Sequence, residues 1–338
     1  MIYDDTTAKK LADSYEVPNR TRESVPEPLV SVRTSAYNHG AYIEKCIEGV
    51  LSQKTSFGFE YIIGEDFSTD GTREKVFDYA RRYPERIRLL TAGYNVGMKA
   101  NGLRCIDACR GKYMAICEGD DYWSDPTKLQ RQVDFMESHP DFSMCFHNAS
   151  TVDVHGRKTG EQRRYDHDCE VPIEDIIHGG GLFCPTASIL FRKEFLATYP
   201  DVCERCHVGD YPLQLWLAVC GRIYYIDRDM AAYRQGDASS WTQRFASQSF
   251  EARTAKWLTE FEMLDAIDAM TEHRHADAIR RRQSRYLRQI MRINTEHEKE
   301  LRRLFAPYFR RQSPLEKLKM GHICLRGRLE SMFGKPVK

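Results

Sequence analysis

Three acidic residues, Glu118, Asp120 and Asp121, follow the apolar run KYMAIC in the stretch KYMAICEGDDYWSDPTKL. A buried strand that ends in carboxylates would hold them rigidly at the rim of a pocket. Carboxylate oxygens presented in this way suit Mg²⁺ or Mn²⁺, which also take substrate phosphates as ligands. A metal there would neutralise a diphosphate and stabilise the charge that develops on a diphosphate leaving group. The alternative is a surface turn whose aspartates cap the next helix.

The elements around these acids alternate between strand and helix patterns. Apolar residues at helical spacing separate the β-rich runs, which are expected at 29–35, 59–66, 86–92, 112–117 and 142–150. Strands that alternate with helical segments of about 10–15 residues indicate βαβ units and an α/β fold with a mostly parallel sheet. Open sheets of this kind bind ligands at the carboxyl ends of their strands. The polar segments SAYNHG, GEDFSTDG, TAGYNVG and CEGDDYW stand at those ends.

Four motifs occur in a fixed order along the chain: LVSVRTSAYNHGAYIEKCIEGVLSQ, IIGEDFSTDGT, NVGMKANGLRC and YMAICEGDDYWSDPTKLQRQ. Together they resemble the family-2 glycosyltransferases, which are inverting enzymes of the GT-A fold that use nucleotide sugars. The resemblance is specific from about Leu29 to Asp153 and can be followed to about Trp241. It implies a GT-A type, Rossmann-like sheet flanked by helices, to which this chain adds a C-terminal helical extension.

The resemblance implies a nucleotide-sugar site in the first half of the chain. The loop TSAYN corresponds to the first nucleotide-binding loop, so Ser35, Tyr37 and Asn38 are expected beside the base and ribose. Asp66 matches an aspartate that accepts a hydrogen bond from the base, and a carboxylate is a suitable partner for a ring N–H. Glu65 stands where the family has another aspartate.

The resemblance also implies where the diphosphate and its metal bind. EGDD corresponds to the family's Asp-x-Asp motif, which makes Asp120 and Asp121 candidates for metal and ribose contact and Glu118 a supporting ligand. Mn²⁺ or Mg²⁺ is the implied cofactor. Lys99 and Arg234 are expected near the phosphates.

Inversion at an anomeric carbon requires a base that removes the proton of the acceptor hydroxyl. The family places an acid at the start of a downstream helix, and in HVGDYPLQLWLA the match is Asp210, preceded by Gly209 instead of the usual glutamate. A capping role for Asp210 is the alternative. The resemblance and the two tryptophans, which are as typical of a core as of a sugar platform, predict an acceptor side formed by Trp123, Pro185, Thr186, Ser188 and Trp241.

The charge distribution sets the C-terminal part apart. Residues 271–338 carry 18 Lys and Arg against 7 Asp and Glu, whereas the rest of the chain carries 32 against 42. Arginines alternate there with Leu, Ile, Met and Phe, and such basic amphipathic helices bind anionic membranes. The alternative is a helical cap that packs on the catalytic domain.

These patterns predict three parts of the chain. We expect a loose N-terminal arm over residues 1–27 and a GT-A domain over residues 28–244. Within that domain, residues 28–153 form the nucleotide-binding half, and residues 154–244 form the half that holds the acceptor and the base. A basic helical extension follows over residues 245–338.

The 11 cysteines are scattered, and the N-terminus shows no secretory signal. The pair in CERC lacks the second pair that a zinc site needs, so we expect reduced structural thiols. No apolar run reaches the about 18–20 residues that span a bilayer. We therefore expect a cytoplasmic protein, or one that is peripheral at the inner face of a membrane.

The predicted function is transfer of a sugar from a nucleoside-diphosphate sugar, UDP-linked, to a carbohydrate or lipid-linked acceptor in cell-surface polysaccharide biosynthesis. Two alternatives remain open. A sugar-1-phosphate nucleotidyltransferase should show a Gly-rich signature with Arg and Lys after the first strand, and SAYNHG lacks it. A non-catalytic relative that binds nucleotide sugars or glycans is kept open as a minor alternative by the departures from the family pattern at Glu65, Glu118, Gly209 and Gln235. No nucleic-acid partner is expected, because no reader motif accompanies the basic charge.

Overall fold

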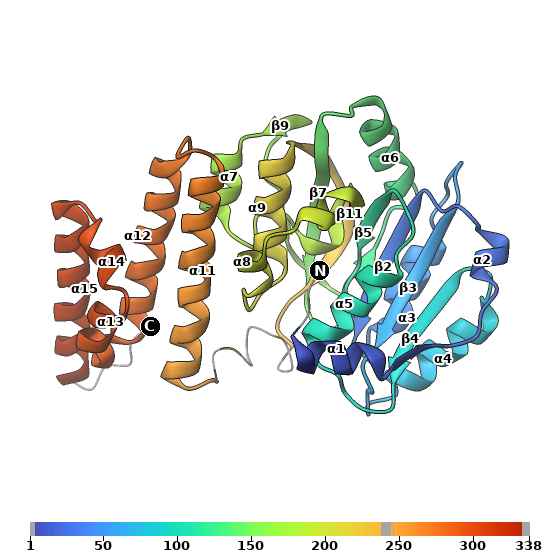
Figure 1. The fold of residues 1–338 in the computed structure, drawn as a ribbon, viewed down its shortest axis with the longest axis horizontal. Helices are drawn as coiled ribbons and strands as arrows, with labels where there is room; N and C mark the ends of the chain where they lie inside the picture. Colours follow the sequence, from blue (N-terminus) through green and yellow to red (C-terminus); the bar gives the residue numbers. More distant parts are fainter. Residues whose placement is uncertain (1–3, 238–244, 246, 333–338) are drawn as a thin grey trace. The chain divides into compact units, whose positions relative to one another are not determined.

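A mixed 11-stranded sheet is the scaffold of the protein (Figure 1). The computed structural model describes residues 4–237, 245 and 247–332, the last nine of them by backbone alone. The strand order is β1-β4-β3-β2-β5-β10-β7-β11-β6, with β8 paired to β7 and β9 paired to β11. The strands are β1 (Ser14–Glu16), β2 (Val30–Ala36), β3 (Phe59–Glu65), β4 (Ile87–Ala92), β5 (Tyr113–Ile116), β6 (Tyr122–Trp123), β7 (Phe142–Val152), β8 (Lys158–Gln162), β9 (Cys169–Val171), β10 (Leu190–Arg192) and β11 (Arg222–Arg234).

Helices connect these strands and then continue alone to the C-terminus. The α-helices are α1 (Asp5–Ala12), α2 (Thr21–Ser24), α3 (Ile43–Leu51), α4 (Thr72–Arg82), α5 (Met98–Ala108), α6 (Lys128–Ser138), α7 (Ile173–Gly179), α8 (Asp201–Glu204), α9 (Asp210–Cys220), α11 (Phe250–Met270), α12 (Ala276–Ile293), α13 (Glu298–Leu304), α14 (Ala306–Arg310) and α15 (Pro314–Met332). Short 3₁₀ turns are η1 (Thr186–Ser188), η2 (Lys193–Thr198) and η3 (Thr295–His297).

The predicted parallel core of the sheet is confirmed. β4, β3, β2 and β5 lie side by side and run parallel, with Ala36 of β2 opposite Glu65 of β3 and Arg33 opposite Ile116 of β5. Their carboxyl ends therefore meet at one edge of the sheet, and the four polar segments that follow them leave from that edge. β10 is antiparallel to both β5 and β7, and β7 runs parallel to β11.

The prediction of a loose N-terminal arm was wrong. That segment contains β1, which pairs with β4 and places Glu16 2.8 Å from the buried guanidinium of Arg88. The structure also has β8 and β9 after Asp153, and β11 is one long strand with register shifts against β7. The short strands β1, β8 and β9 form by pairing with distant strands, where the local pattern is weak.

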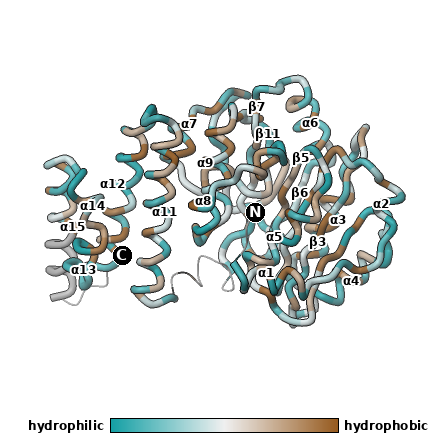
Figure 2. The backbone as a smooth tube through the Cα atoms, in the orientation of Figure 1, coloured by the Kyte–Doolittle hydropathy of each residue, from teal (hydrophilic) through white to brown (hydrophobic). Residues whose placement is uncertain are grey.

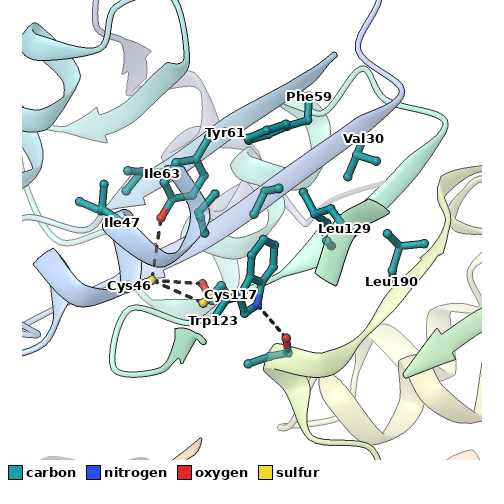
Figure 3. Packing of buried hydrophobic residues seen from close by; sticks show 14 of the residues in the cluster. Val30, Cys46, Ile47, Phe59, Tyr61, Ile63, Cys117, Trp123, Leu129 and Leu190 are labelled. Atoms are coloured by element: carbon teal, nitrogen blue, oxygen red, sulfur yellow. Dashed lines mark hydrogen bonds between the residues drawn. The ribbon is translucent and has the colours of Figure 1, made fainter. Parts of the chain in front are cut away.

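The hydrophobic core lies between the sheet and the helices that cover it. β3 is buried at every residue, and its side chains Phe59, Tyr61 and Ile63 pack with Val30 of β2 and Ile47 of α3 (Figure 3). Hydrophobic residues colour the central strands in Figure 2 accordingly. β-branched and aromatic residues fill a pleated, buried surface well, which explains why these runs form strands. No disulfide joins the cysteines among the described residues.

The chain divides into two compact units. Unit 1 comprises residues 1–172, 181–200 and 216–247 and holds the whole sheet. Unit 2 comprises residues 173–180, 201–215 and 248–338. The predicted C-terminal extension therefore shares its unit with α7 and with the first half of α9, which the sequence suggested would belong to the catalytic domain.

Helix packing forms unit 2. α11 and α12 lie side by side, and α12 also packs against α7 and α15 (Figure 1). Phe261 of α11 contacts Phe305 and Tyr308 at centroid distances of 5.1 and 4.6 Å. The apolar side of the arginine-rich α12, including Leu287 and Ile290, is buried. None of the described helices is long and apolar enough to cross a membrane.

Candidate functional site

Two of the predicted loops are joined through the backbone in unit 1. Gly119 donates its N–H to the carbonyl of Ser35 at 3.1 Å, which fixes the EGDD segment against the TSAYN loop. A side chain at position 119 would collide with His39, so glycine permits this approach. Arg33 strengthens the junction, because it donates to Ser35 Oγ at 3.0 Å and lies 3.3 Å from the Glu118 carboxylate.

Arg234 ties the end of β11 to the same acidic segment. Its backbone N–H donates to Asp121 Oδ1 at 2.8 Å, and its Nε donates to the Asp120 carbonyl at 2.9 Å. The pairing of β6 with β11, in which Trp123 lies opposite Ala231, brings these residues together across 113 positions of sequence. The structure thus places Arg234 beside the acidic segment, and its guanidinium donates to the backbone carbonyls of Asp120 and Asp153. The expected contact of Arg234 with a phosphate stays a prediction.

Three acids concentrate negative charge here, and of these Glu118 is paired with Arg33. Asp121 is 3% exposed, whereas Asp120 and Glu118 are partly exposed. Burial raises the pKa of Asp121 well above its ordinary value, and the charges of Asp120 and Glu118 raise it further. Like charges held this close favour either a proton or a cation.

The carboxylate oxygens of these acids suit a divalent cation whose coordination would be completed by oxygens of the substrate. Among the residues that the structure describes, no group of three or more His, Cys, Asp or Glu side chains is placed to hold a metal by itself. Mg²⁺ characteristically binds one or two carboxylates together with substrate phosphates. Asp120 and Asp121 supply such oxygens, whereas Glu118 is already paired with Arg33.

Tyr42 and Asp237 extend this cluster, and sequence reasoning missed both. The Tyr42 hydroxyl donates to Asp237 Oδ2 at 2.7 Å, and the Arg234 guanidinium lies 4.2 Å from the centre of the Tyr42 ring. The hydrogen bond to Asp237 raises the pKa of Tyr42, and the charge of Asp120 adds to the increase. The sequence motifs could not predict this pair, because Tyr42 and Asp237 are 195 positions apart in the chain.

Asn38 and Asp66, two further residues of the predicted nucleotide-binding loops, stabilise the conformation of those loops through hydrogen bonds. Asn38, at a left-handed φ of 56°, receives a hydrogen bond from Thr69 N at 3.0 Å. Asp66 is buried and accepts hydrogen bonds from Val96 N and Gly97 N at 2.7 and 3.0 Å. Burial raises the pKa of Asp66. A carboxylate has further lone pairs, so an additional bond to a base is compatible with this anchoring.

Tyr37 and Lys99 are exposed at the same edge of the sheet, after β2 and after β4 respectively. Tyr37 is 38% exposed. Lys99 stands on the first turn of α5. The structure therefore connects Ser35, Glu118, Asp120, Asp121 and Arg234 through the contacts given above, and it exposes Tyr37 and Lys99 at the same edge of the sheet.

The predicted acceptor-side residues of unit 1 are largely interior. Trp123 is 3% exposed, and its Nε1 donates to the Ala187 carbonyl at 2.8 Å (Figure 3). The buried Ser188 hydroxyl donates to the Pro185 carbonyl at 2.6 Å. Trp123 thus fits the core role that the sequence left open, and Thr186 is the half-exposed member of this set. Trp241 lies outside the described residues.

Asp210 is the first residue of α9 and belongs to unit 2. It is half-buried, and its Oδ1 accepts a hydrogen bond from Tyr211 N at 2.8 Å. This contact joins neighbouring residues in the first turn of α9. The roles as a base and as a helix cap both stay predictions for Asp210, and a cap bond would run to an N–H two or three positions further on.

A protein-family model matches the first part of the chain. The model described as "Glycosyl transferase family 2" matches residues 31–199, which is half of the chain. An uncharacterized protein of Mycobacterium tuberculosis (strain ATCC 25618 / H37Rv) is 31% identical over 252 residues, which cover 74% of this chain and 71% of the relative. The "Putative teichuronic acid biosynthesis glycosyltransferase TuaG" of Bacillus subtilis (strain 168) is 37% identical over 110 residues, covering 32% of this chain and 42% of the relative.

Solved structures share the fold. Residues 1–349 of S. aureus TarS, in complex with UDP-GlcNAc, match with a TM-score of 0.65 at 16% identity, over 91% of this chain and 93% of that chain. The mannosyltransferase PcManGT of Pyrobaculum calidifontis, in complex with GDP-Man and Mn²⁺, matches with a TM-score of 0.51 at 15% identity, over 97% and 93%. Both likenesses confirm the predicted GT-A type of sheet with flanking helices and C-terminal helices.

Proposed function

The chain belongs to glycosyl transferase family 2, and from this premise we propose that it transfers a sugar, with inversion, from a UDP-linked donor to a carbohydrate or lipid-linked acceptor. The observation that carries the proposal is the junction at the carboxyl edge of the sheet, where Gly119 bonds to Ser35 and Arg234 bonds to Asp121. The membership also decides against the nucleotidyltransferase alternative.

The donor would lie along this junction. Ser35, Tyr37 and Asn38 border the base and ribose in this proposal, and Asp66 accepts from the ring N–H. Arg234 holds the acidic segment in place through the Asp120 carbonyl, so that the carboxylates keep one orientation. Support comes from the structural neighbours, whose complexes contain UDP-GlcNAc and GDP-Man.

Asp120 and Asp121 would hold Mn²⁺ or Mg²⁺ beside the diphosphate. The bound ion would supply positive charge to the diphosphate as it leaves. Residues of the chain hold these acids in place. The backbone N–H of Arg234 fixes the buried Asp121, and Arg33 neutralises Glu118, so that Glu118 adds no repulsion to the charges of Asp120 and Asp121. A structural neighbour binds Mn²⁺ with its donor.

Asp210 is proposed as the base. As the acceptor oxygen forms its bond to the anomeric carbon, its proton passes to a carboxylate oxygen of Asp210. The anomeric C–O bond breaks at the same time, and its electron pair leaves with the diphosphate. The hydrogen bond from Tyr211 N to Asp210 Oδ1 holds the carboxylate at the start of α9.

A membrane surface is proposed as a further partner. Within the described part of unit 2, α15 exposes Leu315 and Leu318 at 60% and 72%, and Lys317 and Lys319 are exposed beside them. Leucines three positions apart share one face of a helix, and flanking lysines attract anionic lipids. The packing role that the sequence offered belongs to α12, whose apolar side is buried. The relative TuaG, by its name, acts in teichuronic acid biosynthesis, which is consistent with a role in cell-surface polysaccharide synthesis.

A thermal-shift panel tests the donor assignment. The full chain is mixed with UDP, GDP, UDP-GlcNAc and GDP-mannose, each with and without Mn²⁺, because a ligand that binds the native state raises the melting temperature. We expect the UDP compounds to raise it most, and only with Mn²⁺. Equal melting temperatures across the panel would contradict nucleotide-sugar binding. A larger shift with the GDP compounds would indicate that the donor carries GDP rather than UDP.

A further inference from the structure

Two aromatic side chains, Tyr37 and Phe67, are exposed where the loops after β2 and β3 begin. Tyr37 is 38% exposed and Phe67 is 40% exposed, although aromatic residues of this size usually bury most of their surface. Tyr37 is already placed beside the base in the proposed function. Phe67 belongs to none of the predicted sites, and the proposed donor site makes no use of it.

Hydrogen bonds between the two loops place these aromatic residues opposite each other. Before them, Asp66 N donates to the Ala36 carbonyl at 3.0 Å. After them, Asn38 N donates to Ser68 Oγ at 3.1 Å. The parallel pairing of β2 with β3 thus continues past the ends of both strands. Each aromatic residue lies between the same two hydrogen bonds, so the two are neighbours at the carboxyl edge of the sheet.

The backbone of Phe67 has a conformation that its side chain disfavours. Its φ is 60°, in the left-handed region, where a bulky residue is an outlier and glycine fits without strain. The loop fixes this conformation, because Ser68 N donates to Glu65 Oε1 at 2.7 Å and Thr69 N donates to Asn38 Oδ1 at 3.0 Å. Strained residues of this kind concentrate at functional sites. Little apolar burial compensates the strain at Phe67, which indicates a use for its exposed ring.

Arg73 lies over the Phe67 ring. Its guanidinium is 5.1 Å from the centre of the ring, within the range of a cation–π attraction. Arg73 is itself held, because it donates to Thr91 Oγ1 at 2.8 Å and pairs with the buried Glu65 carboxylate. The ring is therefore oriented by a charged group that the sheet holds in place, while part of its surface stays open to solvent.

The residue before Phe67 is the carboxylate proposed to accept from the base. Asp66 accepts hydrogen bonds from Val96 N and Gly97 N, and Asn95 Nδ2 donates to its carbonyl at 3.0 Å. The loops after β2, β3 and β4 are thus joined at Asp66. A nucleobase presents ring N–H groups at its edge and a flat π-face, so it matches a carboxylate next to an exposed aromatic ring.

We propose that Phe67 is a further base-binding residue, whose exposed ring stacks on the nucleobase of the donor. The inference rests on the proposed nucleotide-sugar function and adds a stacking contact to the hydrogen bond between the base and Asp66. Every base has a π-face, so aromatic stacking tolerates different bases. Phe67 therefore contributes affinity for uracil and guanine nucleotides alike, and the choice between them belongs to hydrogen-bonding groups such as Asp66.

Nucleotide binding by Phe67→Gly tests this assignment. The full chain with Mn²⁺ is titrated in a calorimeter with UDP, with GDP and with inorganic pyrophosphate, which lacks a base. We expect Phe67→Gly to weaken the nucleotide binding of the wild type by about five- to a hundredfold and to leave pyrophosphate binding unchanged. Phe67→Tyr keeps an aromatic ring and should bind as the wild type does. Tyr15→Ala removes an aromatic residue of β1 that is 50% exposed and is the matched control.

The melting temperature separates binding from stability. Glycine adopts a φ of 60° without strain, so we expect Phe67→Gly to melt at the wild-type temperature or above it. Wild-type nucleotide affinity in Phe67→Gly would overturn the stacking contact and leave the proposed function standing. Equal losses for nucleotide and pyrophosphate would also overturn it, since Phe67 would then act on the shape of the loop. A wild type that binds neither nucleotide would contradict the proposed function, and this inference with it.

Discussion

Two clusters of carboxylates differ in how their charge is compensated. The acid cluster of unit 1, formed by Glu118, Asp120 and Asp121, receives a backbone N–H and one ion pair. Unit 2 holds Asp210 at the start of α9 and the buried acid Glu260 in α11, where His207 Nε2 lies 3.3 Å from Glu260 Oε1. Both contain a buried carboxylate whose pKa is raised by burial and by an acidic neighbour.

The difference separates two uses of negative charge. In the acid cluster the guanidinium of Arg234 bonds to backbone carbonyls, so the side-chain charge stays available for a cation. In unit 2 the buried Glu260 carboxyl lies beside His207, and burial raises the pKa of Glu260 to about 7 and lowers the pKa of His207 to about 4. The first arrangement suits a metal and a diphosphate, and the second favours a protonated carboxyl group.

The largest expected effect is on transfer itself. Asp210→Asn removes the proposed base while keeping the shape of the side chain, so we expect turnover to fall by about 10²- to 10⁴-fold and donor affinity to stay unchanged. Turnover is measured as nucleoside diphosphate release, and affinity by calorimetry. Asp201→Asn, also an acid in the first turn of a helix of unit 2, serves as the control. Turnover near the wild-type rate in Asp210→Asn would place the base elsewhere.

The next effect concerns stability. The pKa of Glu260 is about 7 in the native protein, above its ordinary value of 4.5, so the native state binds this proton more tightly than the unfolded state between those pH values. The wild type should therefore lose roughly 2–3 kcal/mol of unfolding free energy relative to Glu260→Gln as pH rises from about 4.5 to 7. Denaturant unfolding at several pH values measures the difference, and parallel curves would show that Glu260 is ionised throughout.

A smaller effect is expected in the acid cluster. Asp120→Asn should weaken Mn²⁺-dependent donor binding by about tenfold or more, because one charged oxygen donor is lost where like charges are concentrated. Asp134→Asn, an exposed acid on α6, is the matched control. Isothermal titration with UDP-GlcNAc in the presence of Mn²⁺ measures the affinity of each variant. Equal affinities of the wild type and Asp120→Asn would contradict the assignment of a metal ion to this cluster.

The smallest effect is expected at the proposed membrane face. Leu315→Ser with Leu318→Ser should reduce binding to vesicles that contain anionic lipid by about tenfold, since each leucine contributes part of the about 1.5–3 kcal/mol of a fully buried side chain. Leu182→Ser changes a leucine of unit 1 that is 62% exposed and should leave binding unchanged. Sedimentation with vesicles gives the result. Undiminished binding of the double variant would move the membrane contact away from α15.

The central sheet was predictable because its strands carry a strong local signal. The runs at β2, β3, β4 and β5 are apolar, rich in β-branched or aromatic residues and separated by amphipathic helices, so both their type and their parallel pairing followed. β1, β8 and β9 lack that signal. Each is short and exists through pairing with a distant strand, as the contact of Glu16 with Arg88 illustrates.

The site was predictable in part for the same reason. Ser35 and the acids follow strands directly, and the parallel order of those strands brings their ends together. Tyr42, Asp237 and Glu260 could not be found, because their contacts span long stretches of sequence and no spacing rule links them. Trp123 shows the opposite case, since a residue type suited to a sugar platform lies in the core.

The order of apolar runs and polar ends along the chain determined the sheet, its family and the side chains available for chemistry, because each of these depends on patterns within a few residues. Only the tertiary structure decided how those side chains are compensated. It placed Arg234 on the acidic segment, built a short edge strand at Glu16, and set His207 beside the buried Glu260. Such partners come from separate elements, and packing of those elements is what brings a proton or a cation to one carboxylate rather than another.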